Sequence, residues 1–483
     1  MGGLWLFFFG WCLRPIWGID IFFHVAIGRY AFESGIPSTD ILSAAHPDAA
    51  WAPFQIGYEL LVAWIDEVAG LDGLRVVHAA LFATGFTWAV RFFRRKTGTP
   101  WLAAFMTLIF LVLFEERIRL RPHAFNLLFE VFVLLPLASG AWRKSPSRWG
   151  IALVGVAAVW AFIHAMAVFW LIAVLGTVLV FGVGLEERRW GALVLGLSVL
   201  AIIAAPGAVD GISHVLSIQG DWAPYVPELA PSWSWFSVGT AFGVVSGLLP
   251  WLAVTAVLAA IVWRPERHRW PTIAAAAGLA FGGVWMVRLS YYAPFAIALV
   301  APEVGRVLGA RRLSHSMRAL TVAMAVLLLA HVAPRYEGVN PWTETLYPDS
   351  FPDLEVDAMV DAGFTGGIFN ETEWGGYLLY RLHPNCAVLT DGRVTFQQDV
   401  GELLRLDDRP EYRAEALEQA WKRYGVDLAV RRKGKVPEQP GWELLLRGPV
   451  ADIWSRRGEA NEARRSALGE VLRSGQRAPS GGP

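Results

Sequence analysis

A series of long apolar segments constrains the fold of this sequence more than any other feature. Residues 1–19 contain one charge, Arg14, and can cross a bilayer if slightly tilted. Further segments follow, each near the ~20 residues that a span needs: 73–93, 100–116, 123–142, 149–164, 165–185, 190–206, 235–263, 270–287, 289–309 and 319–334. Only 17% of residues are charged, against about 25% in soluble domains. We therefore predict an α-helical polytopic membrane protein with about eleven spans.

Basic residues predict how these spans are oriented. They cluster in alternate loops, at 91–96, 143–148, 188–189, 264–269 and 306–318. The positive-inside rule makes those loops cytoplasmic. The parts that then face outward are loop 20–72, segment 115–122, loop 207–234 and everything after residue 335.

The composition turns soluble after residue 335. Helix patterns at 352–362, 374–382 and 410–424 alternate with strand patterns at 366–370, 386–390, 426–430, 442–448 and 450–456. We therefore predict three parts: a transmembrane module at 1–334 that includes outer loop 20–72, an extracytoplasmic α/β domain at 335–456, and a disordered tail at 457–483.

Several functional classes are excluded by charge, cysteine content and motifs. The formal net charge is +0, which gives no pull toward nucleic acid. Cys12 and Cys386 are far apart, so neither a disulfide framework nor a thiolate metal site is indicated. The sequence has no P-loop, GxSxG, HExxH or CxxC pair.

The first outer loop carries two carboxylates, Asp20 and Asp40, with His24 between them. A carboxylate just outside a span can act as a general base or bind a divalent cation such as Mg²⁺ or Mn²⁺. The alternative is that Asp20 and Asp40 only cap the segments that follow them.

The run EERIRLRPH, residues 115–123, places arginines on the outer side, against the positive-inside trend. Guanidinium groups suit phosphate, and Arg121 before Pro122 stands where the next span begins. His123 follows directly. The alternative is a solvated turn in which Glu115 and Glu116 pair with the arginines.

Two further charged or titratable residues stand at outer span ends. Arg288 lies between two apolar segments and needs a partner there, for which a lipid phosphate is suitable. His164, in WAFIHAM, is more typical of a satisfied core histidine than of a ligand.

The soluble domain contains a fourth set, in the run from Asn370 to Arg393. Trp374 and Tyr377 flank two glycines that permit close backbone approach, and Asp391 begins an Asp-Gly-Arg turn that ends at Arg393. Turn chemistry explains most of this pattern, and contact with an acceptor is the functional alternative.

These residues together resemble a known family. The pattern comprises DIFFH at 20–24 with Gly28, GIP at 35–37, Asp40, RPH at 121–123, WAFIH at 160–164, Arg288, Asn370, WGGY at 374–377 and DGR at 391–393. It resembles the bacterial integral-membrane glycosyltransferases of the GT-C superfamily, which include mannosyltransferase-like and aminoarabinose-transferase-like proteins. The resemblance covers the chain to about residue 455.

The resemblance implies an inverting transfer of a sugar from a polyprenyl-phosphate donor to a glycan, lipid or protein acceptor on the outer face of the bacterial inner membrane. Asp20 or Asp40 would be the base or metal ligand, and Arg121, Arg288 and His123 would hold the donor phosphate. His24 and His164 would support the site. Trp374, Tyr377, Asp391 and Arg393 would contact the acceptor.

A non-catalytic protein is the competing function, either a transporter or flippase of lipid-linked glycans or an assembly scaffold. A transporter would place ionisable groups near the midplane of several spans and show internal repeats. The sequence shows neither, and this favours chemistry at the membrane surface.

Overall fold

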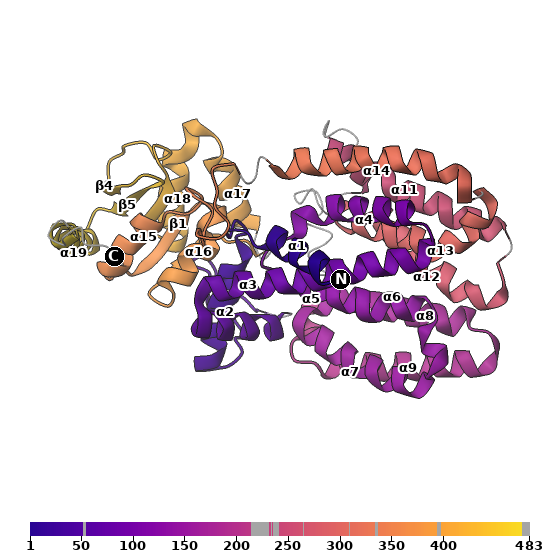
Figure 1. Cartoon of the computed structure of the whole chain (residues 1–483). Coiled ribbons are helices and arrows are strands. Elements are labelled where there is room, and N and C mark those ends of the chain that lie inside the picture. The colour runs from indigo at the N-terminus through magenta and orange to yellow at the C-terminus, as the bar shows by residue number, and fades with distance from the viewer. Residues whose placement is uncertain are drawn as a thin grey trace. The chain divides into compact units, whose positions relative to one another are not determined.

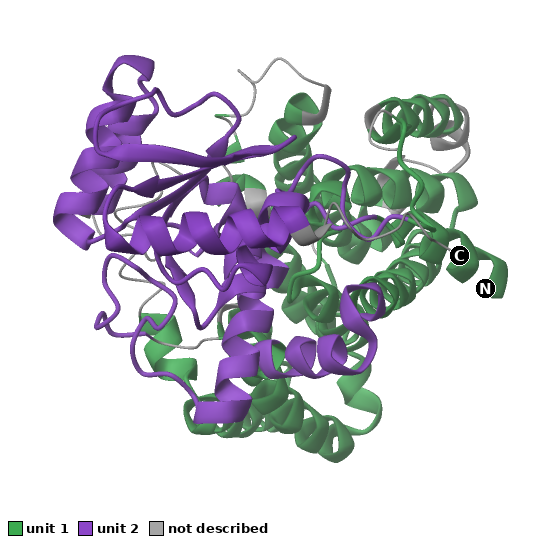
Figure 2. Cartoon of the chain, turned by 90° about the vertical axis from the view of Figure 1, so that its left-hand side faces the viewer, with its two compact units in different colours: residues 1–14, 54–58, 74–343 green, residues 15–53, 59–73, 344–483 purple. Residues whose placement is uncertain are grey.

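The computed structural model describes residues 1–51, 55–213, 231–232, 234, 241–263, 265–308, 310–333, 337–393 and 398–475. The chain forms two compact units (Figure 2). Unit 1 consists of Met1–Arg14, Phe54–Tyr58 and Leu74–Thr343, and unit 2 of Pro15–Pro53, Glu59–Gly73 and Glu344–Pro483.

Unit 1 is helical (Figure 1). Its elements are α1 (Gly2–Cys12), parts of α3 (Ile56–Thr97), α4 (Pro100–Phe114), η1 (Glu115–Arg117), α5 (His123–Phe129), the π-helical turn η2 (Glu130–Leu134), α6 (Leu135–Ala138), η3 (Ala141–Lys144), α7 (Pro146–His164), η4 (Ala165–Val168), α8 (Phe169–Phe181), α9 (Gly184–Ala204), α11 (Ala241–Val262), η7 (Arg267–Arg269), α12 (Trp270–Trp285), η8 (Val287–Tyr292), α13 (Ala293–Leu308) and α14 (Ala310–Val332).

Aromatic packing fills the core of unit 1. The ring of Phe86 on α3 lies 5.7 Å from that of Phe110 and 5.5 Å from that of Phe114, both on α4. All three side chains are buried. In lipid such close contact between side chains, rather than exclusion of water, holds helices together.

The predicted number of eleven spans is not confirmed. Among the described residues, the helices long and apolar enough to cross a membrane are Ile56–Thr97, Pro146–His164 and Gly243–Val262. Shorter apolar helices account for further predicted segments, at Gly2–Cys12, His123–Ala138, Phe169–Phe181, Leu289–Val304 and Arg318–Ala330. Helix α1 ends before Pro15, which cannot continue it, so the predicted span 1–19 is cut short. Most of predicted loop 207–234 lies outside the described residues.

Unit 2 contains a five-stranded mixed sheet with the strand order β2-β1-β3-β5-β4. Strands β1 (Gly366–Asn370), β2 (Cys386–Val388) and β3 (Leu428–Arg432) run parallel, whereas β4 (Trp442–Arg447) and β5 (Ala451–Arg456) complete an antiparallel side. The helices are α2 (Asp20–Ser34), α15 (Asp353–Asp361), α16 (Thr372–Leu382), α17 (Gln398–Asp407), η10 (Pro410–Tyr412), α18 (Arg413–Tyr424) and α19 (Glu459–Gly475). The predicted α/β domain is present, but helix α17 was not predicted from the sequence.

The outer loop belongs to unit 2 and extends its sheet. Ser43 pairs with Val388 as an isolated parallel bridge, and the Ala44 amide donates to the Val388 carbonyl at 2.8 Å. The predicted division, which placed loop 20–72 in the membrane module, therefore differs from the observed units. The sequence pattern marks strands but does not reveal that a loop more than 300 residues away pairs with β2.

The predicted tail at 457–483 is helical as far as Gly475. Helix α19 buries Leu468 and makes polar contacts with the sheet: Asn461 donates to Glu443 at 2.7 Å, and Arg464 donates to Ser455 at 3.2 Å. Its high proportion of charged and small residues predicted disorder, but a few specific partners order it. Residues 476–483 lie outside the described residues.

Candidate functional site

Two carboxylates hold one guanidinium in unit 2. Arg393 donates to Asp40 Oδ1 at 2.6 Å through Nη1 and to Asp391 Oδ2 at 2.7 Å through Nη2, with Nε 3.0 Å from Asp391 Oδ1. All three side chains are buried. Burial would lower the pKa of Arg393, but the charges of Asp391 and Asp40 raise it above its usual range. The group is therefore a fixed ion triad with a formal charge of about minus one.

Local turns place these partners. The Arg393 amide donates to Asp391 Oδ1 at 2.8 Å, and the Leu42 amide donates to Asp40 Oδ1 at 3.3 Å, so each carboxylate also closes its own Asx-type turn. The Trp51 ring lies under the guanidinium, 4.9 Å from Arg393 Cζ. The side chains of residues 394–398 lie outside the description.

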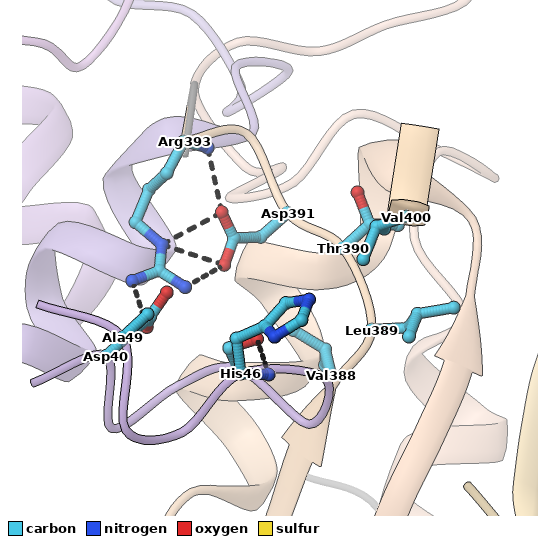
Figure 3. Close-up of a pocket in the computed structure, with 10 residues that line it drawn as sticks. Asp40, His46, Ala49, Val388, Leu389, Thr390, Asp391, Arg393 and Val400 are labelled. Carbon is cyan, nitrogen blue, oxygen red and sulfur yellow. Dashed lines mark hydrogen bonds and ion pairs between the residues drawn. The ribbon is translucent and has the colours of Figure 1, made fainter. Parts of the chain in front are cut away.

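A small pocket of about 30 Å³ opens beside the triad (Figure 3). It is lined by Asp40, Ser43, His46, Ala49, Val388, Leu389, Thr390, Asp391, Arg393 and Val400. His46 Nε2 lies 3.2 Å from Asp399, which also accepts from the Tyr424 hydroxyl at 2.7 Å. The polar residues of its lining are Asp40, Ser43, His46, Thr390, Asp391 and Arg393, and its volume holds one or two water molecules.

Asp20 lies against the same turn. It is the first residue of α2, whose cap position belongs to Ile19, so Asp20 is not the capping residue that one interpretation predicted. A Cβ atom on Gly392 would approach Asp20 Oδ1 to 2.7 Å. The structure therefore brings Asp20 together with the Asp391-Gly392-Arg393 turn, which the sequence analysis had assigned to a separate set.

The two glycines of WGGY make this arrangement possible. A Cβ on Gly375 would overlap the Thr390 carbonyl oxygen and lie 2.7 Å from Asp391 Cα. A Cβ on Gly376 would lie 2.6 Å from the Ile19 carbonyl oxygen. Helix α16 thus packs between the start of α2 and the turn after β2, because neither glycine carries a side chain.

Trp374 and Tyr377, predicted to contact the acceptor, have buried side chains with partners inside unit 2. Both side chains are about 1% exposed. The Trp374 indole donates to the Ser350 carbonyl at 2.9 Å, and the Tyr377 hydroxyl donates to Asp353. Burial and the neighbouring Asp353 raise the pKa of Tyr377. Their role is to fix α16 in the core of unit 2.

His24 has a buried acidic partner. Its Nδ1 lies 3.2 Å from Glu59 Oε1, and both side chains are at least nine-tenths buried. Helix α2 and the start of α3 approach closely here, since a Cβ on Gly28 would overlap the Glu59 carbonyl oxygen. His24 is therefore positioned by Glu59, a residue that the sequence analysis did not select.

A divalent cation shared by Asp20 and Asp40 does not fit this geometry. The Arg393 guanidinium lies 2.6 Å from Asp40 Oδ1, so that oxygen already has a cationic partner, and a metal ion bound to it would have to displace the guanidinium. Within the described ranges, no cluster of three or more His, Cys, Asp or Glu side chains is arranged to hold a metal ion.

In unit 1 the structure links two of the predicted phosphate-binding segments. Arg117, in the run 115–123, lies with Cζ 5.6 Å from the ring centre of Tyr291. Tyr291 belongs to η8, which also contains Arg288. The side chain of Arg288 lies outside the description, whereas Arg121 is half-buried at the turn before α5.

The glutamates of that run differ in their partners. Glu115 is fully buried and accepts a hydrogen bond from Arg14 Nη1 at 2.6 Å, although the two residues are far apart in the chain. Glu116 pairs locally with Arg119 at 3.4 Å, as the solvated-turn interpretation predicted. Arg14, the single charge of the first apolar segment, is thus satisfied by Glu115.

The two predicted unit 1 histidines lie together. The rings of His123 and His164 are 5.8 Å apart, edge to face. Asn126 connects them to the core: its amide nitrogen lies 2.6 Å from His164 Nδ1, and its oxygen accepts from the Trp160 indole at 2.9 Å. His164 therefore has the partners of a satisfied core histidine, while it also contacts a predicted site residue.

Sequence reasoning missed two buried carboxylates. Glu59 lies on a helix face with the buried apolar residues Ile56, Val62 and Ala63, and Glu130 interrupts the apolar run FNLLFEVFVLL. A lone acidic residue on an apolar face is a signal that would have found both.

Comparison with known proteins identifies the fold. No protein-family model matches the chain, and no curated protein sequence matches it. The Archaeoglobus fulgidus oligosaccharyltransferase tethered by a disulfide to an acceptor peptide with the NVT sequon matches with a TM-score of 0.51 and 12% identity, covering 89% of this chain and 68% of that chain. Its apo form matches with a TM-score of 0.50 and 11% identity, covering 86% and 66%.

A third structure, the A. fulgidus oligosaccharyltransferase AglB with an inhibitory peptide and a dolichol-phosphate, has a TM-score of 0.51 and 12% identity, covering 89% of this chain and 69% of that chain. At such identities the likeness concerns the fold. The chain therefore shares its fold with this membrane oligosaccharyltransferase, in agreement with the fold that the resemblance in its sequence implied.

Proposed function

We propose that this protein is a membrane glycosyltransferase that moves a sugar from a polyprenyl-phosphate-linked donor to an acceptor on the outer face of a bacterial inner membrane. The observation that carries the proposal is the fold match over 89% of the chain to an oligosaccharyltransferase. One matching structure contains a dolichol-phosphate, a lipid phosphate of the proposed chemical class.

The proposed reaction inverts the anomeric carbon. An acceptor hydroxyl or amine attacks C1 of the sugar, and a new bond to C1 forms as the C1–O bond to phosphate breaks. The electron pair of that bond leaves with the polyprenyl phosphate, and the acceptor proton passes to a carboxylate. The enzyme must therefore supply a base for the acceptor and cations for the phosphate charge.

Asp20 is the better base of the two carboxylates predicted. Asp40 Oδ1 accepts from Arg393 Nη1 at 2.6 Å and from the Leu42 amide at 3.3 Å, so this oxygen is already engaged in holding the outer loop. Asp20 is the first residue of α2, and a Cβ atom on Gly392 would approach its Oδ1 to 2.7 Å, so Asp20 borders the turn that Asp391 and Arg393 form. We assign Asp40, Asp391 and Arg393 to holding the outer loop.

The donor phosphate is assigned to cations of unit 1. Arg121 and Arg288 supply guanidinium groups at the outer ends of apolar segments, and His123 begins α5 directly after Pro122. The partners are thus a lipid-linked donor, membrane lipid, and a glycan, lipid or protein acceptor. No step of the proposal passes through a metal.

The experiment uses the full chain in lipid nanodiscs with a panel of polyprenyl-phosphate sugars. Wild type should transfer one sugar to an acceptor. Asp20→Asn should lower the transfer rate by about 10²- to 10⁴-fold, the usual contribution of a general base, with donor affinity retained. Arg121→Ala and Arg288→Ala should instead weaken donor binding.

A matched control separates catalysis from structure. Asp72→Asn alters an exposed carboxylate that accepts from Thr345 at 3.0 Å within unit 2, and it should leave transfer unchanged. Donor turnover by Asp20→Asn at the wild-type rate would remove Asp20 from the reaction. Movement of the lipid-linked sugar across the bilayer without transfer would instead support the transporter or flippase function.

A further inference from the structure

A buried carboxylate in unit 1 has no role in the proposed reaction. Glu130 is about 1% exposed and begins η2, the π-helical turn that follows α5. Single π-helical turns inside helices are rare and often occur at functional sites. An ionisable side chain inside an apolar bundle is costly unless the protein uses it.

Two phenols of η8 converge on one oxygen of Glu130. Tyr291 donates to Oε1 at 3.0 Å, and Tyr292 donates to the same atom. Oε2 is buried and accepts no hydrogen bond from the described residues. Glu130 is therefore the main polar attachment point of η8 that the described contacts reveal.

Apolar contacts also hold η8, in addition to its hydrogen bonds to Glu130. The Tyr292 ring lies 4.7 Å from that of Trp170 on α8, and the Tyr291 ring lies 5.0 Å from that of Phe114 on α4. A Cβ on Gly283 would lie 3.4 Å from the Leu289 carbonyl oxygen. The segment thus turns tightly between α12 and α13 as a 3₁₀-helix, a conformation of poorer hydrogen-bond geometry that neighbours must support.

The same segment carries Arg288 and approaches Arg117. Arg288 precedes Tyr291 by three residues, and the Tyr291 ring faces the Arg117 guanidinium at 5.6 Å. We infer that Glu130 is a positioning residue: through Tyr291 and Tyr292 it fixes η8, and so fixes the backbone position of Arg288, the residue that we propose binds the donor phosphate. This inference rests on the proposed function, because it assigns the phosphate to Arg288.

The test compares Glu130→Leu, Glu130→Gln and the double variant Tyr291→Phe, Tyr292→Phe in nanodiscs. Gln keeps a carbonyl oxygen that accepts from both phenols, whereas Leu and the phenylalanines remove the attachment. Glu303→Gln is the control, since Glu303 is equally buried on α13 but pairs with Arg269 at 2.6 Å.

Two readouts are measured. Hydrogen exchange of a peptide covering 287–292 should rise at least about tenfold in Glu130→Leu and in the double variant, and stay near wild type in Glu130→Gln and Glu303→Gln. Affinity for a sugar-free polyprenyl phosphate should fall about tenfold in the first two, equivalent to about 1.4 kcal/mol, and by less than about threefold in the last two.

Each outcome decides a part of the inference. Unchanged exchange in both disrupting variants would overturn the anchoring of η8, and the double variant serves if Glu130→Leu does not fold. Raised exchange with unchanged phosphate affinity would show a structural role only and overturn the link to the donor. If wild type binds no polyprenyl phosphate, the proposed function fails along with that link, while the exchange data still decide the anchoring.

Discussion

Two buried sites, the triad of unit 2 and Glu130 of unit 1, hold their carboxylates in different ways, although unit 1 also contains a buried ion pair between Glu115 and Arg14. In unit 2, Asp40 and Asp391 are ionised partners of one guanidinium, and the contacts are short and charge-assisted. In unit 1, Glu130 is met by two neutral hydroxyl groups on one of its oxygens. A buried ion pair fixes geometry strongly but has a high desolvation cost, and breaking it is strongly destabilising. A hydrogen bond from a neutral hydroxyl contributes less free energy, and losing it costs less.

This difference has a consequence for function. A loop joined to a distant turn by an ion triad is expected to be rigid, and rigid placement would suit the catalytic base that we propose at Asp20. A segment held by phenols exchanges its hydrogen-bond partners more easily, and this would suit the part of unit 1 to which we assign the lipid donor. The predictions below test whether the energies differ as the chemistry requires.

The largest effect is expected from removing the guanidinium of unit 2. Arg393→Met leaves Asp40 and Asp391 buried without their cation and should destabilise the closed outer loop by about 3–5 kcal/mol, the usual cost of breaking a buried pair. Hydrogen exchange of peptides covering 38–51 measures that loss. Arg465→Met, which removes an exposed contact to Glu443 at 3.4 Å, should change exchange in unit 2 very little.

The close approach of α16 gives the next largest effect. Gly375→Ala introduces a Cβ that overlaps the Thr390 carbonyl oxygen, and because backbone must move, we expect a cost of about 1–3 kcal/mol or more. In α17, Gly401→Ala meets nothing within 4 Å and should be neutral or stabilise the helix by up to ~1 kcal/mol. Both are measured by protection of strand β2 against exchange; equal protection in the two variants would contradict the packing role of WGGY.

The stability of unit 2 should depend on pH because its buried carboxylates are paired with cations. Burial would raise the pKa of Glu371, but Arg431 at 3.1 Å and Lys435 at 2.8 Å lower it below its ordinary value of 4.5. Its folded pKa lies below the unfolded one, so its contribution to stability is fully present above about pH 4.5 and is lost as pH falls through the folded pKa.

Glu371→Gln removes this titration. The variant should be less stable than wild type at pH 6, and the difference between the two should shrink as the pH falls below 4.5. Thermal unfolding in mild detergent at several pH values measures it. A gap that stays constant down to pH 3 would mean that Glu371 is held by packing rather than by charge.

The sequence predicted much of the fold because its signals are local. Apolar length marks membrane helices, and alternating patterns marked all five strands of unit 2 from Gly366 to Arg456. Gly35, which ends α2 with a φ of 85°, was likewise a readable helix stop.

The parts that sequence could not supply are the long-range pairings. Nothing near Asp40 indicates that its partner is Arg393. The two residues are 353 positions apart in the chain, and their contact depends on how α16 packs against α2. Likewise, nothing near Trp374 and Tyr377 in the sequence indicates that their polar atoms donate to Ser350 and Asp353 inside the unit. The sequence marks candidate residues by their type, whereas their partners become known only from the contacts.

The smallest effect is expected in unit 1, where neutral donors share one oxygen. Tyr291→Phe removes one of the two hydroxyl groups on Glu130, and because Tyr292 still donates to the same atom, the cost should be about 0.5–1.5 kcal/mol. Hydrogen exchange of peptides covering 287–292, together with the thermal midpoint of the full chain in nanodiscs, measures it. If Tyr291→Phe lost as much stability as Arg393→Met, Glu130 would be bound to its partners as tightly as the ion triad is. The difference between the two sites would then come from where they lie in the molecule and not from the chemistry of their hydrogen-bond donors.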